Sequence, residues 1–167
     1  MLVIVCGLPG TGKTTLAREV AKNIPAVHIS SDAIRMMLLS KRTYSEKEKE
    51  GVYEVMFNKA EELLTAGRSV VLDATFYKKS LREKARAIAE KTKSKFFLVE
   101  CTTPEGLLRE RMVARKKSES ESEADFEVYK KIKKIFEPIK GKHLIVDTSQ
   151  PIGRQVGLVM NYLREEY

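Results

Sequence analysis

The chain has 167 residues and a net charge of +8, with 43% hydrophobic and 32% charged residues. This composition excludes a disordered or membrane-embedded protein and suits a single domain, residues 1–167, with a sizeable core. No apolar run approaches the length of a membrane span and no secretory signal precedes the first apolar stretch, so we expect a cytoplasmic protein without a membrane partner.

Short apolar strands alternate with longer helical patterns along the chain. Strands are predicted at Leu2–Cys6, Ala26–Ile29, Val70–Asp73, Phe96–Cys101 and His143–Val146. Helices are predicted at Lys13–Asn23, Asp32–Leu39, Ser45–Ala66, Ser80–Lys91, Pro104–Lys116, Ala124–Phe136 and Gly153–Glu165. Apolar strands that are regularly separated by helices predict an α/β fold, in which helices cover both faces of a parallel sheet.

Residues 7–14, Gly-Leu-Pro-Gly-Thr-Gly-Lys-Thr, match the phosphate-binding loop pattern G-x-x-x-x-G-K-[ST] between a buried strand and a helix. Glycines let the backbone curl around a polyphosphate, and the helix that follows presents its positive end. Lys13 would neutralise the β- and γ-phosphates, and the Thr14 hydroxyl would bind Mg²⁺. We therefore expect ATP and Mg²⁺ to bind here, through Gly10, Thr11, Gly12, Lys13, Thr14 and Thr15.

Asp32 and Arg35 follow the second predicted strand. Asp32 suits a helix cap, but ligands also bind at the carboxyl edge of an open α/β sheet, where this carboxylate could accept the proton of an attacking hydroxyl. Arg35 lies one helical turn later and can hold an anionic group of a substrate. At this point both the structural and the catalytic interpretation of Asp32 stand.

Asp73 ends the third predicted strand, Val-Val-Leu-Asp. The carboxyl ends of the strands face the phosphate-binding loop in this kind of sheet, so Asp73 can hold Mg²⁺ or one of its waters. The alternative is a carboxylate that caps the next turn. Together with the phosphate-binding loop, its position favours the metal role.

Arg111 and Arg115 share one face of the fifth predicted helix and lead into a polar run, Ser118–Glu123, without an apolar stripe. Two arginines before a mobile segment suit a lid, over about residues 109–125, that closes on the phosphates and stabilises charge in the transition state. The alternative is a basic helix end that interacts favourably with the helix dipole.

The order of these motifs resembles that of a known group of P-loop kinases. The phosphate-binding loop, S-D-x-I-R after the second strand, V-V-L-D-A-T at the third strand and an arginine-bearing lid follow one another from Met1 to about Thr148. The group includes the 5′-hydroxyl kinase domain of polynucleotide kinase and the kinase domain of archaeal L-seryl-tRNA(Sec) kinase, with zeta toxins and kinases for gluconate or chloramphenicol as more distant relatives. The resemblance implies a three-layer P-loop NTPase fold with a five-stranded sheet of order 2-3-1-4-5 and a mobile lid.

The resemblance also implies roles for matching residues. Asp32 matches the general base, Arg35 the arginine that holds the acceptor's phosphate, and Asp73 with Thr75 a turn that lines the acceptor site. Arg111 and Arg115 match the lid arginines, and residues 147–151 follow the last strand where related kinases hold adenine. Phe76 stands where these relatives commonly carry Asn.

These matches predict an ATP- and Mg²⁺-dependent kinase that phosphorylates a hydroxyl, first of all the 5′-hydroxyl end of RNA or DNA. No counterpart of the tRNA-binding domain of seryl-tRNA kinases is evident, and a stacking aromatic can suffice for a free end. The candidates are Tyr44, Tyr53, Phe76 and Tyr77; each could equally be a core or half-buried residue, which we expect for Tyr53 because it lies with Phe57 on the long helix. A small-metabolite kinase, a nucleotide-dependent ATPase or switch, and a zeta-like toxin that acts on nucleotide sugars are the alternatives. Basic residues between Arg68 and Lys95 either attract phosphates or form a solvated helix face.

Overall fold

The computed structural model describes residues 1–38, 45–115 and 119–165, with the side chains of 119–124 excepted. Its strands are β1 (Leu2–Cys6), β2 (Ala26–Ser30), β3 (Ser69–Asp73), β4 (Phe96–Thr102) and β5 (Leu144–Asp147). Its helices are α1 (Lys13–Asn23), α2 (Ser31–Leu38), α3 (Glu46–Thr65), α4 (Lys79–Lys91), α5 (Glu105–Arg115), α6 (Glu119–Ile135) and α7 (Ile152–Glu165). All neighbouring strands are parallel and their order is β2-β3-β1-β4-β5, which confirms the predicted P-loop NTPase fold.

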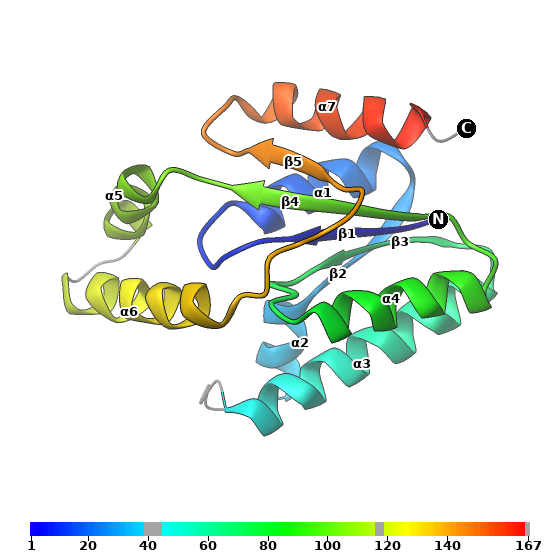
Figure 1. Cartoon of the computed structure of the whole chain (residues 1–167), viewed down its shortest axis with the longest axis horizontal. Coiled ribbons are helices and arrows are strands. Elements are labelled where there is room, and N and C mark those ends of the chain that lie inside the picture. Colours follow the sequence, from blue (N-terminus) through cyan, green and yellow to red (C-terminus); the bar gives the residue numbers. More distant parts are fainter. Residues whose placement is uncertain (39–44, 116–118, 166–167) are drawn as a thin grey trace.

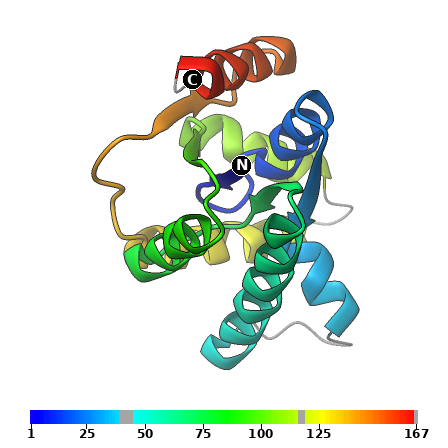
Figure 2. The same ribbon diagram turned by 90° about the vertical axis from the view of Figure 1, so that its right-hand side faces the viewer.

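The molecule has three layers, with the sheet in the middle (Figures 1 and 2). Helices α3 and α4 cover one face, against a core that includes Leu2, Ile4 and Leu72. Helices α1 and α7 cover the other face, against Val3 and Val5. Every residue of β1 is buried, as expected for a central strand with helices on both sides.

Helices α5 and α6 lie beyond the carboxyl ends of the strands rather than on a face of the sheet (Figure 1). They share a small core of their own, formed by Leu108, Met112, Phe126 and Tyr129, and Leu8 of the phosphate-binding loop packs against it. The expected lid region is therefore a helical pair that is seated on the phosphate-binding loop.

Apart from the start of α6, the predicted boundaries that fall on described residues lie within one residue of the observed ones. The predicted start of this helix at Ala124 is wrong, because α6 begins at Glu119 and residues 119–123 form its first turns; Ser118 lies outside the described residues. Acidic residues favour the amino end of a helix because they complement its dipole, and this local preference outweighs the missing apolar stripe.

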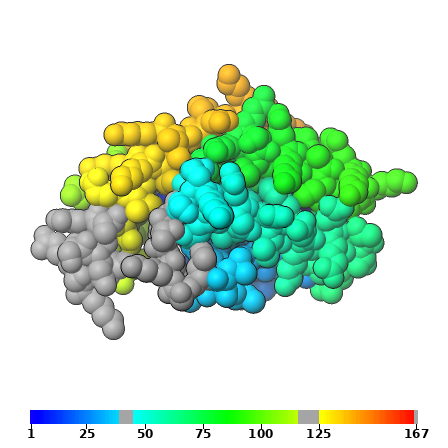
Figure 3. Space-filling view, turned by 90° about the horizontal axis from the view of Figure 1, so that it is seen from below, coloured from blue at the N-terminus to red at the C-terminus, as the bar shows by residue number. Residues whose placement is uncertain are grey.

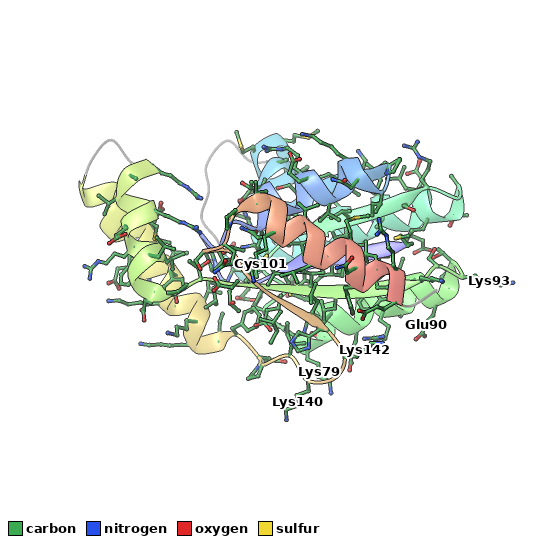
Figure 4. The ribbon with its side chains drawn as sticks, turned by 90° about the horizontal axis from the view of Figure 1, so that it is seen from above. Lys79, Glu90, Lys93, Cys101, Lys140 and Lys142 are labelled. Atoms are coloured by element: carbon green, nitrogen blue, oxygen red, sulfur yellow. The ribbon has the colours of Figure 1, made fainter. Side chains whose placement is uncertain are left out.

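Both cysteines are buried, as the sequence predicts, and they belong to the cores on opposite faces of the sheet. Figure 4 places Cys101 in the interior of the molecule. Burial raises the pKa of the Cys6 thiol and raises that of Cys101 to about 12. Both side chains therefore remain protonated and act as small apolar residues.

The basic stretch between Arg68 and Lys95 has the character of a solvated helix face. Glu90 and Lys93 lie at the end of the molecule opposite to α5 and α6 (Figure 4). Acidic residues accompany the lysines, since Lys91 pairs with Glu61 of α3. None of the helices in the described residues is long and apolar enough to cross a bilayer.

Candidate active site

The phosphate-binding loop joins β1 to α1 and is closed by local contacts. Thr11 Oγ1 donates a hydrogen bond to the carbonyl oxygen of Leu8 (2.7 Å), and Lys13 Nζ donates to the same oxygen (3.0 Å). Helix α1 begins at Lys13, so its unpaired backbone N–H groups belong to the end of this loop. A curled loop at a helix amino end is a natural anion-binding site.

At two glycines of this loop, a side chain would come too close to neighbouring atoms. A Cβ at Gly7 would lie 2.5 Å from the carbonyl oxygen of Cys101, and one at Gly10 would lie 2.9 Å from Met112 Cε. Both glycines have a positive φ, of 142° and 79°. The absence of side chains therefore lets β4 pack against one end of the loop and α5 against its middle.

A cavity of about 550 Å³ opens beside the loop. Most of the predicted site residues line it: Gly10, Gly12, Lys13, Thr14, Thr15, Asp32, Arg35, Asp73, Thr75 and Arg115. Thr11 and Arg111 are not among the lining residues. The cavity also contacts residues that the motifs did not indicate, namely Lys49 on α3 and Asp125, Val128 and Ile132 on α6.

Asp73 lies at the carboxyl end of β3 and is 2% exposed. Its Oδ2 contacts Nε2 of His28 on β2 at 3.0 Å, so the imidazole orients the carboxylate. The Thr14 hydroxyl lines the same cavity, and hydroxyl and carboxylate oxygens are ligands that suit Mg²⁺. Among the described residues there is no group of three or more His, Cys, Asp or Glu that could hold a metal ion.

Asp32 lies in the first turn of α2, where its Oδ1 contacts Arg35 Nη1 at 2.9 Å. The Asp32 side chain is 64% exposed, whereas that of Arg35 is 9% exposed. Arg35 Nε also contacts Glu48 Oε1 of α3 at 3.1 Å. The arginine therefore connects α2 to α3 and fixes one oxygen of Asp32 at the cavity wall.

Ser45 caps α3, as the sequence predicts: its Oγ accepts a hydrogen bond from the Glu48 backbone N–H at 3.2 Å. The Glu48 carboxylate in turn contacts Arg35 across the gap between α2 and α3. This contact has no signature in the sequence, because Arg35 and Glu48 lie on different helices and no local spacing relates them.

The turn after β3 is held in shape by buried contacts. Phe76 is fully buried with φ of 50°, and its N–H donates a hydrogen bond to Tyr53 Oη at 2.9 Å. Arg82 donates to the carbonyl oxygen of Phe76 (2.6 Å) and to that of Glu137 (2.9 Å). The Glu137 N–H donates to the carbonyl oxygen of Tyr77 (2.8 Å), so the end of α6 is tied to this turn.

These contacts decide which aromatic side chains can reach a ligand. Phe76 belongs to the core, so the expectation that it stacks on a base is wrong. Tyr53 is also a core residue, as expected from its place beside Phe57, but it lines the cavity as well. Tyr44 lies outside the described residues. Tyr77 is mostly buried but lines the cavity.

The two arginines of α5 have different positions. Arg115 lines the cavity. Arg111 Nη2 donates a hydrogen bond to the carbonyl oxygen of Thr148 (2.8 Å), in the segment after β5. A Cβ at Gly12 would lie 3.7 Å from Thr148, so this segment borders the phosphate-binding loop. Arg111 thus contacts the segment expected to hold adenine, and Arg115 lines the same cavity as the phosphate-binding loop.

Comparison with known proteins agrees with this fold. Residues 2–139 match the AAA domain family AAA_33, and the chain belongs to this family. An uncharacterized protein of Mycobacterium tuberculosis, Rv2004c, is 35% identical over 136 residues. That match covers 74% of this chain and 27% of the relative, so the chain spans about a quarter of the relative's length.

Solved kinase structures have the same fold. The APS kinase CysC of Mycobacterium tuberculosis, in complex with AMPPNP and APS, superposes with a TM-score of 0.75 at 21% identity, covering 98% of this chain and 96% of that one. A gluconokinase of Sinorhizobium meliloti superposes with a TM-score of 0.71 at 21% identity, covering 98% and 91%. At these identities the likeness establishes the shared P-loop kinase fold.

Proposed function

We propose that the protein is an ATP- and Mg²⁺-dependent kinase that transfers the γ-phosphoryl group of ATP to a hydroxyl. The observation that carries this proposal is the shared cavity: Lys13 and Thr14 of the phosphate-binding loop line it together with Asp32, Asp73 and Arg115. A phosphate site, a carboxylate and a lid arginine around one space are the parts that phosphoryl transfer requires. The kinases of the same fold, APS kinase and gluconokinase, add support.

In this proposal each residue has a separate role. Asp32 accepts the proton of the attacking hydroxyl, and its contact with Arg35 uses one of its two oxygens and orients the other. Lys13 and Arg115 bind oxygens of the transferring phosphoryl group, where charge develops in the transition state. Thr14 and Asp73 would hold Mg²⁺, which supplies further neutralisation of the phosphate charge.

The walls of the cavity favour a small hydroxylated acceptor over a long polynucleotide strand. Of the aromatic residues expected to stack on bases, Phe76 is fully buried and does not line the cavity, whereas Tyr53 and Tyr77 line it but are only 6% and 4% exposed. The far wall is formed by Val128 and Ile132 of α6. The 5′-hydroxyl end of RNA or DNA is the second candidate, since the Tyr77 ring can contact a terminal base.

The test is transfer of label from γ-labelled ATP, with Mg²⁺, to 5′-hydroxyl oligonucleotides, nucleosides, sugars and sugar acids, for wild type and Asp32→Asn. We expect labelled product from the wild type, and turnover lower by about 10²- to 10⁴-fold in the variant. Affinity for AMPPNP should be nearly unchanged. The matched control is Glu90→Gln, an exposed carboxylate on α4 that does not line the cavity.

Three outcomes are informative. Loss of AMPPNP binding in Asp32→Asn would contradict the general-base role. Steady release of phosphate that no acceptor changes would assign the protein to nucleotide-dependent ATPases or switches. Label on oligonucleotide ends alone would keep the mechanism and replace the small acceptor by a nucleic-acid end.

A further inference from the structure

Arg35 and Lys49 are the two cationic side chains at the acceptor end of the cavity, among the residues that the structure describes. Arg35 is already balanced by two carboxylates, Asp32 at 2.9 Å and Glu48 at 3.1 Å. The Glu48 side chain is only 4% exposed, so this pair is shielded from water. A guanidinium engaged in this way connects two helices and has little charge left for a ligand.

Lys49 has a different environment. Its Nζ lies 3.4 Å from Glu46 Oε1 and 5.0 Å from the centre of the Tyr77 ring, and its side chain is 13% exposed. An ammonium group has three N–H donors, and a ligand in the cavity can reach this one.

The carboxylate of Glu46, which lies beside Lys49, also contacts Tyr77 and Lys78. Glu46 is 57% exposed, and its other oxygen, Oε2, accepts a hydrogen bond from Tyr77 Oη (3.1 Å) and contacts Lys78 Nζ at 3.5 Å. A long ion pair with an exposed, shared carboxylate neutralises a lysine only weakly. Lys49 is therefore paired with a single carboxylate that also contacts Tyr77 and Lys78, whereas Arg35 is paired with two, and it lies next to an aromatic ring at a wall of the cavity.

The same helix connects this charge to the proposed general base. Lys49 follows Glu48 directly on α3, and Glu48 is joined through Arg35 to Asp32. Figure 3 shows the amino-terminal part of α3 beside α6, which forms the opposite wall. An acceptor between these walls would meet a carboxylate for its hydroxyl and an ammonium group for a negative group.

We propose that Lys49 binds a negative group of the acceptor, so that the substrate is an anionic alcohol, a compound with a hydroxyl and a carboxylate or phosphate. This inference rests on the proposed kinase function and assigns the recognition of the anion to α3 instead of to Arg35. The Tyr77 ring and the apolar residues Val128 and Ile132 contact the remainder of the acceptor.

The test compares Lys49→Met with Lys78→Met. Lys78 is a matched control, because its Nζ also contacts Glu46 and lies 5.4 Å from the Tyr77 ring centre, yet it does not line the cavity. Transfer from γ-labelled ATP is measured for paired acceptors: nucleoside 3′-monophosphates against nucleosides, and gluconate against glucose. The first pair tests whether a phosphate group on the acceptor is recognised, and the second pair tests whether a carboxylate is recognised.

We expect the wild type to prefer the anionic member of at least one pair, and Lys49→Met to lower kcat/KM for that member by about 10- to 100-fold, the effect of one charge-assisted hydrogen bond. Its effect on the neutral member, and the effect of Lys78→Met on both, should be small. Equal rates for charged and neutral acceptors, or equal losses in the two variants, would overturn the assignment.

A binding measurement separates this inference from the kinase function. Binding of inorganic phosphate is titrated calorimetrically to protein loaded with AMPPNP and Mg²⁺, so that the phosphate-binding loop is occupied. Phosphate binding that is lost in Lys49→Met and kept in Lys78→Met supports the anion site even if no acceptor is phosphorylated, in which case the kinase proposal alone fails. Phosphate binding that is absent, or insensitive to Lys49, refutes the anion site whatever the transfer assay shows.

Discussion

The two halves of the cavity are built in different ways. The nucleotide half depends on contacts between close neighbours in the chain, such as those from Thr11 and Lys13 to the Leu8 carbonyl oxygen. The acceptor half depends on contacts between distant segments: Tyr77 bonds to Glu46, and Arg82 bonds to Glu137 at the end of α6. Local sequence therefore determines the phosphate site, whereas tertiary packing determines the acceptor site.

This difference has a consequence for variants. A substitution in the phosphate-binding loop should alter nucleotide binding and turnover while the acceptor walls keep their shape. A substitution in the contacts that hold the acceptor walls should alter stability and acceptor recognition while the loop stays intact. A variant that changes nucleotide binding and turnover therefore assigns its residue to the nucleotide half of the cavity. A variant that changes stability and acceptor recognition assigns its residue to the acceptor half.

The largest expected effect is that of Lys13→Met. It removes the cation at the start of α1 that lines the cavity beside Gly12 and Thr14, so phosphoryl transfer should fall by at least about a hundredfold. The measurement is label transfer at saturating acceptor, with urea unfolding to confirm that the fold is kept. The control is Lys22→Met on the same helix, an exposed lysine paired with Glu19. Wild-type turnover in Lys13→Met would refute the proposed phosphate site.

An intermediate effect is expected for Arg82→Met. The variant keeps an unbranched apolar chain beside Phe136 but leaves the carbonyl oxygens of Phe76 and Glu137 without their buried donor. We expect the free energy of unfolding to fall by about 2–4 kcal/mol, because these bonds come from a charged group. Urea unfolding measures this change.

The matched control for Arg82 is Arg86, one turn later on α4, which is exposed and lies over the Phe96 ring at 4.5 Å. Arg86→Met should cost less than about 1 kcal/mol, as for an exposed cation–π contact. Equal losses in the two variants would show that α4 is stabilised by its charge in general and not by the bonds to the turn. AMPPNP affinity should change little in either variant.

The same contrast explains how much could be predicted from the sequence. The strands and the phosphate-binding residues were predictable because apolar periodicity and the loop pattern are local, whereas the strand order followed from the resemblance to P-loop kinases. The start of α6 was not, because the Ser/Glu run has no apolar stripe and its acidic residues instead favour a helix amino end.

The position of Lys49 at the cavity and the contact of Glu48 with Arg35 could not be predicted from the sequence, for a physical reason. Both lie in the charged first turns of α3, where the sequence Glu-Lys-Glu-Lys is typical of a solvated helix start. Only the packing of α2 against α3 brings Glu48 to Arg35 and leaves Lys49 at the cavity. Phe76 is the opposite case. Its place in a motif that lines the ligand site suggested an exposed side chain, but its backbone has a positive φ and its side chain packs in the core.

The smallest expected effect concerns His28, which lies outside every motif and yet contacts Asp73 across two strands. His28→Ala removes the group that orients a proposed Mg²⁺ ligand, so the Mg²⁺ concentration that half-saturates AMPPNP binding should rise about tenfold. A titration of AMPPNP binding against Mg²⁺ measures this without turnover. His143→Ala is the matched control, because His143 makes a similar contact with Glu100 (3.1 Å), a carboxylate that, unlike Asp73, does not line the cavity. An Mg²⁺ dependence that neither variant alters would show that Asp73 is held by its strand alone, and the contribution of tertiary contacts would then be limited to the acceptor half.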